Sequence, residues 1–223
     1  MPPKLTVRAC MECNADLGQK FENPAAPLLK PLVVGDLAEF TPAQLRSVAA
    51  WLWLKDIEYV LMRDVTYERD QDEKPMTEAT MTEWRHHLRN LRRTVRPPEG
   101  YVARLGVIGH SADPATHASI RPFVRADFTA HYRGITSFNQ VGRAVFQTTL
   151  TGSRAAAKLA AEMSLDDRTD LLWPADGTIA VPKMRLPFGD VVRWKDELEF
   201  HPNSQITSGF RMRIPPPVGP SRP

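Results

Sequence analysis

Residues 41–63 read Thr41-Pro-Ala-Gln-Leu-Arg-Ser-Val-Ala-Ala-Trp-Leu-Trp-Leu-Lys-Asp-Ile-Glu-Tyr-Val-Leu-Met-Arg63 and include the most apolar stretch of the chain, Ala49 to Leu54. Thr41 suits the N-cap of a helix, Pro42 suits its first position, and Gln44 completes a capping box. The apolar side chains that follow fall on more than one face of such a helix, which is typical of a buried helix. We therefore predict a central core helix from Pro42 to about Arg63.

A second helix is predicted C-terminal to this one, from about Thr77 to Val95. Its apolar residues are spaced by four, three and four positions and form a single stripe: Trp84, Leu88, Leu91 and Val95. The pair Pro97-Pro98 ends this helix, because proline has no backbone N–H to donate.

Beyond Pro98 the pattern changes from helical to extended. Stretches rich in Val, Ile, Phe and Thr predict strands, and an Ala-rich stretch predicts a helix. Strands are expected at Tyr101 to Gly109, about Ile120 to Phe128, Arg143 to Thr151 and Leu171 to Pro174, and helices at Arg154 to Met163 and within Gly189 to Phe200. The predicted class is α+β, in which helices precede a small antiparallel sheet that carries one or two further helices.

Composition restricts the classes of function. The chain has 223 residues, of which 42% are apolar, so it can bury a core. Its net charge is +3, and it holds 21 arginines against 8 lysines. Arginine binds phosphates bidentately, although a GC-rich genome would produce the same bias. No apolar run has the length of a signal peptide or a membrane span, so we expect a cytoplasmic protein that does not enter membranes.

Cys10 and Cys13 form a Cys-x2-Cys pair after a short strand predicted at residues 4–9. Such a turn can bring two thiolates to one Zn²⁺, which normally takes four ligands. Two free thiols explain the pair as well. A redox dithiol would require Cys10 at a helix N-terminus, whereas the pattern indicates a strand end. Helices are predicted at residues 15–22, ending near Asn23-Pro24, and at residues 25–33.

The sequence from Val7 to Glu22 resembles the end of HNH endonuclease modules, in which Cys-x2-Cys-Asn opens a helix. The resemblance is closest to a group of bacterial HNH-like proteins and covers residues 7–60. The matching positions are Asn14, Lys20-Phe-Glu22, the run from Pro27 to Leu32, Ala50 to Lys55 and, later, Leu172-Trp-Pro174.

This resemblance implies that Cys10 and Cys13 are structural zinc ligands and that Asn14 occupies a position near a catalytic metal. The related modules also carry an upstream Cys-x2-Cys and an acidic-His pair, but only nine residues precede Cys10 here and none is histidine. A late start codon, a gene split in two or a degenerate relative would each explain this. We assign no catalytic residue, and expect metal-dependent endonuclease activity, with its divalent metal, only if the missing half is supplied.

The chain is predicted to contain three regions. Residues 1–96 would hold the zinc-knuckle half and a helical region, and residues 97–212 a mixed α/β region. Residues 213–223 are rich in proline and predict a disordered tail.

The second predicted helix carries an arginine ridge (Arg85, Arg89, Arg92, Arg93 and Arg96). Arg85, Arg89, Arg92 and Arg96 repeat the spacing of the apolar stripe and lie about 100° around the helix from it. Such a ridge can follow a phosphate backbone. A solvated structural face is the alternative, because cations near a helix C-terminus suit the helix dipole.

Two functions follow from these patterns. The first is an HNH endonuclease-related, nucleic-acid-associated protein that binds DNA through the arginine ridge and lacks nuclease activity as this chain stands. The alternative is a non-catalytic protein-interaction module that completes its zinc site with a partner chain or in a homo-oligomer.

Overall fold

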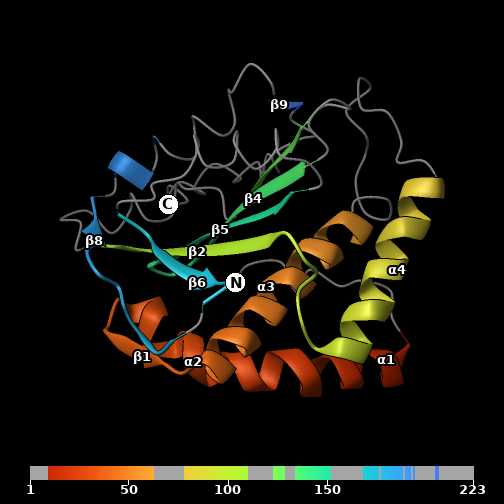
Figure 1. The fold of residues 1–223 in the computed structure, drawn as a ribbon, viewed down its shortest axis with the longest axis horizontal. Helices are drawn as coiled ribbons and strands as arrows, with labels where there is room; N and C mark the ends of the chain where they lie inside the picture. Colours follow the sequence, from red (N-terminus) through yellow and green to blue (C-terminus); the bar gives the residue numbers. More distant parts are fainter. Residues whose placement is uncertain are drawn as a thin grey trace, which may run out of the picture.

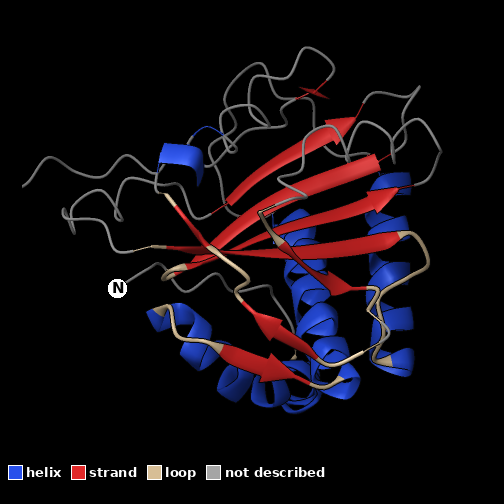
Figure 2. Cartoon of the chain, turned by 60° about the vertical axis from the view of Figure 1, so that its left-hand side comes forward, coloured by secondary structure: helices blue, strands red, loops and turns tan. Residues whose placement is uncertain are grey.

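The computed structural model describes residues 10–62, 78–109, 123–128, 134–151, 168–175, 177–187, 189–191, 193 and 204–205. Helices α1 to α4 (within residues 11–94) lie together on one side of an antiparallel sheet (Figures 1 and 2). The α+β class is confirmed. None of the described helices is both long and apolar enough to cross a membrane.

The N-terminal helix is longer than predicted. Its segments α1 (Met11–Leu17), the π-helical η1 (Gly18–Glu22) and α2 (Asn23–Val34) follow one another directly. The predicted stop near Asn23-Pro24 was therefore wrong. In the π turn that precedes Pro24, the Asn23 N–H donates to the carbonyl of Gly18. Burial of Phe21, Ala25 and Leu32 then holds the helix on the core.

The central helix α3 (Pro42–Met62) is confirmed, together with its cap. The Thr41 N–H donates to Gln44 Oε1 at 2.8 Å, and the Gln44 N–H donates to Thr41 Oγ1 at 3.4 Å. Buried residues surround the helix rather than forming one stripe: Leu45, Val48, Ala49, Ala50, Leu52, Trp53, Leu54, Asp56 and Ile57.

Helix α4 (Glu78–Thr94) packs beside α3, as Figure 1 shows. Trp84 and Leu91 of the predicted stripe are buried, and the Trp84 ring lies 5.6 Å from that of Trp53. The helix ends because Val95 adopts a φ of 50°, in the left-handed region. Arg96 therefore leaves the helical spacing on which its place in the arginine ridge was predicted.

The main sheet has the order β6-β2-β5-β4-β3-β9, and β8 pairs in parallel with β2. Its strands are β2 (Tyr101–Ile108), β3 (Phe123–Phe128), β4 (Gly134–Val141), β5 (Ala144–Thr151), β6 (Asp170–Trp173), β8 (Arg185–Leu186) and β9 (Ser204–Gln205). A second sheet pairs β1 (Ala38–Phe40) with β7 (Ile179–Val181).

Strands β2, β3, β5 and β6 agree with the prediction to within a few residues, whereas β1, β4, β7, β8 and β9 were not predicted. The predicted strand at residues 4–9, the helix at residues 154–163 and the tail at residues 213–223 lie outside the described residues. Of the helix expected within residues 189–200, the structure describes helical residues at 189–191 and 193.

One hydrophobic core joins the helices to the sheet. It contains Leu52 and Trp53 of α3, Leu91 of α4, Leu105 of β2 and Phe146 of β5. Side chains from both sides of the predicted boundary at Arg96 thus meet in the same core. The division into regions 1–96, 97–212 and 213–223 stays a prediction.

Candidate nucleic-acid interface and thiol pair

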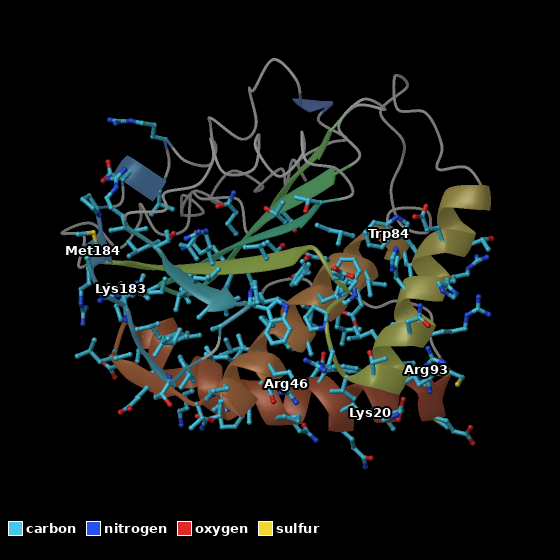
Figure 3. All side chains as sticks on the ribbon, in the orientation of Figure 1. Lys20, Arg46, Trp84, Arg93, Lys183 and Met184 are labelled. Atoms are coloured by element: carbon cyan, nitrogen blue, oxygen red, sulfur yellow. The ribbon has the colours of Figure 1, made fainter. Side chains whose placement is uncertain are left out.

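The C-terminal half of α4 lies between the cysteine pair and a groove. One side of this half contacts α1, where Cys10 and Cys13 lie, and the other side forms the wall of the groove. Figure 3 shows the labelled Lys20 and Arg93 close to this junction of α1 and α4.

Cys10 is the N-cap of α1, a helix N-terminus that the sequence did not predict at this position, whereas the strand predicted before it lies outside the described residues. The backbone of Cys10 is extended, with φ −64° and ψ 156°, and its sulfur accepts the Cys13 N–H at 3.2 Å. The Asn14 N–H donates to the Cys10 carbonyl at 2.9 Å and so closes the first helical turn. Burial of Leu17 and Phe21 in the core stabilises the helical segment that begins directly after Cys10. The geometric condition for a redox dithiol is therefore met at Cys10.

The two thiols differ in acidity. Hydrogen bonds from the Cys13 thiol and then from the Cys13 backbone lower the pKa of Cys10 below its ordinary value. The same contact between the thiols, followed by burial, raises the pKa of Cys13. Cys10, which is also the more exposed thiol, is thus the one that forms a thiolate at lower pH.

Arg92 of the arginine ridge is partly exposed and bound to side chains of α1. Its Nε donates to Asp16 Oδ2 at 2.8 Å, and its Nη1 lies 3.9 Å from Cys13 Sγ. Lys20 Nζ lies 2.8 Å from Asp16 Oδ1, and it donates to the Arg92 carbonyl at 3.4 Å. Lys20 and Arg92 together lower the pKa of Asp16. Arg92 therefore fastens the end of α4 to α1.

A groove of about 590 Å³ lies on the other side of α4. Its floor contains Trp53, Leu91, Pro97 and Tyr101, all of which are buried. Its remaining lining residues are His87, Asn90, Arg93, Thr94, Arg96, Pro98, Glu99, Gly100, Trp173 and Pro174. The groove thus combines an apolar floor with two exposed arginines and one exposed glutamate.

His87 adds no positive charge to this groove at neutral pH. Burial lowers its pKa, Glu83 opposes this shift and His86 reinforces it. The imidazole lies edge-on to the ring of Trp53, with centroids 5.5 Å apart. The charge of the groove therefore comes from Arg93, Arg96 and Glu99.

The described residues do not supply a complete zinc shell. They contain no group of three His, Cys, Asp or Glu side chains that could hold a metal ion. The group beside Cys13 is the guanidinium of Arg92, which cannot coordinate a cation. Asn14 is exposed on the first turn of α1. Cys10 and Cys13 would thus need further ligands from elsewhere, and the divalent metal expected near Asn14 stays a prediction.

Sequence reasoning missed a buried carboxylate beneath the groove. Asp56 is 3% exposed. Its oxygens accept hydrogen bonds from Tyr101 Oη at 2.8 Å, Ser137 Oγ at 2.6 Å and Thr148 Oγ1 at 2.8 Å. Burial raises the pKa of Tyr101 well above its ordinary value, so its hydroxyl stays a donor. The position of Asp56 among the apolar residues of α3 is the signal that could have revealed it.

Comparison with known proteins adds no assignment. No family model, no curated protein and no solved structure matches this chain. The HNH resemblance therefore remains a prediction that depends on residues 7–60.

Proposed function

We propose that this protein is an HNH endonuclease-related protein that associates with nucleic acid through the arginines at the C-terminal end of α4. The observation that carries this proposal is the exposure of Arg89, Arg93 and Arg96 around that end, with two of them on the wall of the groove. Endonuclease activity belongs to the proposal only if an acidic-His pair and further zinc ligands are supplied in addition to the described residues.

The arginines must provide the attraction by themselves. The C-terminal end of a helix carries the negative end of the helix dipole, which repels phosphates. Binding at this end of α4 therefore depends on guanidinium groups, each of which can bind a phosphate with two hydrogen bonds. Such contacts position a nucleic acid without reading its sequence.

The structure changes which members of the arginine ridge belong in the proposal. Arg92 already binds Asp16, and Arg85 also has a partner in the structure. The binding surface consists instead of Arg89, Arg93 and Arg96, which we name the arginine edge. Arg93 and Arg96 of this edge line the groove, and Arg89 is exposed beside them on α4.

Charge reversal at the arginine edge tests this proposal. Fluorescence anisotropy with a labelled DNA duplex in low salt should show that Arg89→Glu/Arg93→Glu weakens binding by roughly a hundredfold, because two attractions become repulsions. Arg46→Glu is the matched control, since Arg46 is exposed on α3 and Figure 3 shows it well away from Arg93. Equal affinity of the double variant and the wild type would refute the proposal, as would a wild type that binds neither the duplex nor a single strand.

A second candidate function follows from the thiol pair. Cys10 is exposed, and the described residues bring no third ligand to it. We propose as the alternative that a partner chain, or a second copy of this chain, completes a zinc site there. Native mass measurement combined with metal analysis should find stoichiometric zinc only in an assembly, and Cys10→Ser should abolish both. Zinc bound fully by a monomer, or by no species, would contradict this alternative.

A further inference from the structure

The groove beside α4 has the size and lining of a small-ligand site. Its volume of about 590 Å³ falls within the range typical of such sites, roughly 300–1,000 Å³. A base in a duplex is paired and stacked and cannot enter a groove of this kind. An unpaired base can enter it, provided that an aromatic ring lies where the base can stack and a cation lies where the neighbouring phosphate can bind.

Of the two tryptophans among the described residues that line the groove, Trp173 is the one that a ligand can reach. Trp53 and Tyr101 are each 2% exposed and form the floor. Trp173, at the end of β6, is half-buried, so part of its indole ring faces the groove. Asn90 and Thr94 line the same groove, and their side-chain oxygens can accept hydrogen bonds from the edge of a base. The Thr94 hydroxyl itself donates to the Asn90 carbonyl at 3.0 Å.

The turn at Val95 brings the cations to this ring. On an uninterrupted helix Arg96 would point with Arg85 and Arg89, away from the groove. The left-handed φ of 50° at Val95 instead places Arg96 on the groove wall with Arg93. Two guanidiniums and one indole, from segments nearly eighty residues apart in sequence, therefore line one groove.

We infer that the groove binds a single unstacked nucleobase of a single-stranded nucleic acid, with Trp173 against the base and Arg93 and Arg96 on the neighbouring phosphates. This inference rests on the proposed function and specifies its substrate as single-stranded. Glu99 on the same wall repels phosphate, so the affinity is held below what the arginines alone would give.

Oligonucleotides with and without bases test the inference. In fluorescence anisotropy at low salt, the wild type should bind a twelve-nucleotide oligothymidylate about tenfold more tightly than the same strand with abasic sites, because stacking on an aromatic ring is lost. Trp173→Leu should remove this difference and leave duplex affinity unchanged, whereas Trp173→Phe should largely retain it. Glu99→Gln should tighten binding of both strands.

The outcomes separate this inference from the function on which it rests. If neither strand nor duplex binds the wild type, the proposed function fails. If duplex and strands bind but the abasic strand binds as tightly as oligothymidylate, only the groove inference is overturned. This comparison uses the wild type alone, so it decides the inference even if Trp173→Leu does not fold. Thermal denaturation of each variant shows which of them fold.

Discussion

At the scale of single residues, Asp56 is a carboxylate that the core shields from water and surrounds with hydroxyl donors. Asp56→Leu would leave the hydroxyls of Tyr101, Ser137 and Thr148 without this acceptor, and each such buried group costs about 1–3 kcal/mol. Ser137 and Thr148 would still bind each other, since their oxygens lie 2.6 Å apart. We therefore expect the free energy of unfolding to fall by about 3 kcal/mol, measured by urea denaturation.

Tyr101→Phe is the matched variant for this network. It removes one donor and leaves Asp56 its other hydroxyl partners, so it should lower the free energy of unfolding by about 1 kcal/mol. The double variant should lose less than the sum of the two, because both changes remove the same hydrogen bond. Strict additivity would show that the bond between Tyr101 and Asp56 contributes nothing.

His87 should make stability depend on pH below neutrality. Burial lowers the pKa of His87 in the folded state, so the unfolded chain takes up this proton first as the pH falls below about 6.5. The contribution of His87 to stability is therefore complete above about pH 6.5, and it is lost as the pH falls through the pKa of the folded state. Urea denaturation at pH 7.5 and pH 5.5 measures this loss.

His87→Phe provides the comparison, because it keeps an aromatic ring against Trp53 and removes the titrating group. The variant should lose less stability than the wild type between the two pH values. If both proteins lose the same amount, groups other than His87 cause the dependence.

Residue-level prediction succeeded where the interaction is local. The capping box at Thr41 joins groups three positions apart, so the sequence is enough to predict it. The helix N-terminus at Cys10 was missed because cysteine is not among the usual N-cap residues. The turn at Val95 could not be predicted, since a β-branched residue rarely adopts a positive φ.

At the scale of elements, two glycines play opposite roles. Gly142 makes the tight turn between β4 and β5 with a φ of 58°, and a Cβ there would lie 2.5 Å from the Val33 carbonyl oxygen. Gly142→Ala should therefore lower the free energy of unfolding by at least about 1–3 kcal/mol. Gly18 has helical dihedrals, and a Cβ there meets nothing within 4 Å. Gly18→Ala should raise the free energy of unfolding by about 0.5–1 kcal/mol.

Thermal and urea denaturation of the two alanine variants check this pair. Opposite signs are expected from the same chemical change, so a general effect of adding a methyl group cannot explain the result. A neutral Gly142→Ala would mean that the contact with Val33 is easily relaxed.

Helices and strands were predicted correctly where the sequence pattern that indicates them is strong. The apolar stripe of α4 repeats over several turns, and α3 was marked by its capping box and its apolar residues on several faces, so both helices were found. Strand β4 alternates weakly, and it was missed although Gly142 indicated a hairpin with β5. The prolines of α2 suggested a break, but burial of its apolar residues outweighed this local preference.

At the scale of the whole molecule, the candidate site consists of segments that are distant in the sequence. Asp16 and Arg92 are 76 residues apart, and the groove extends from Trp53 to Pro174 along the chain. The spacing of residues on α4 predicted the arginine ridge but not the residues that its members contact. Packing against α1 withdraws Arg92 from the ridge, and only the tertiary structure shows this.

The dependence of DNA binding on salt tests this division of the arginine ridge. Each phosphate neutralised on duplex DNA contributes about −0.9 to the slope of log K against log salt. The three residues of the arginine edge predict a slope of about −2.7, whereas all five arginines of the ridge would give about −4.5. Anisotropy titrations between low and physiological salt measure the slope.

Two variants locate the charges responsible for this slope. Arg93→Gln should reduce its magnitude by about 1, because one phosphate contact is lost. Arg92→Gln should leave it unchanged, because Arg92 is bound to Asp16. A wild-type slope near −4.5 that Arg92→Gln reduces would mean that DNA competes with Asp16 for Arg92 and releases the end of α4 from α1. That result would mean that DNA binding also changes the surroundings of the thiol pair, since the Arg92 guanidinium contacts Cys13.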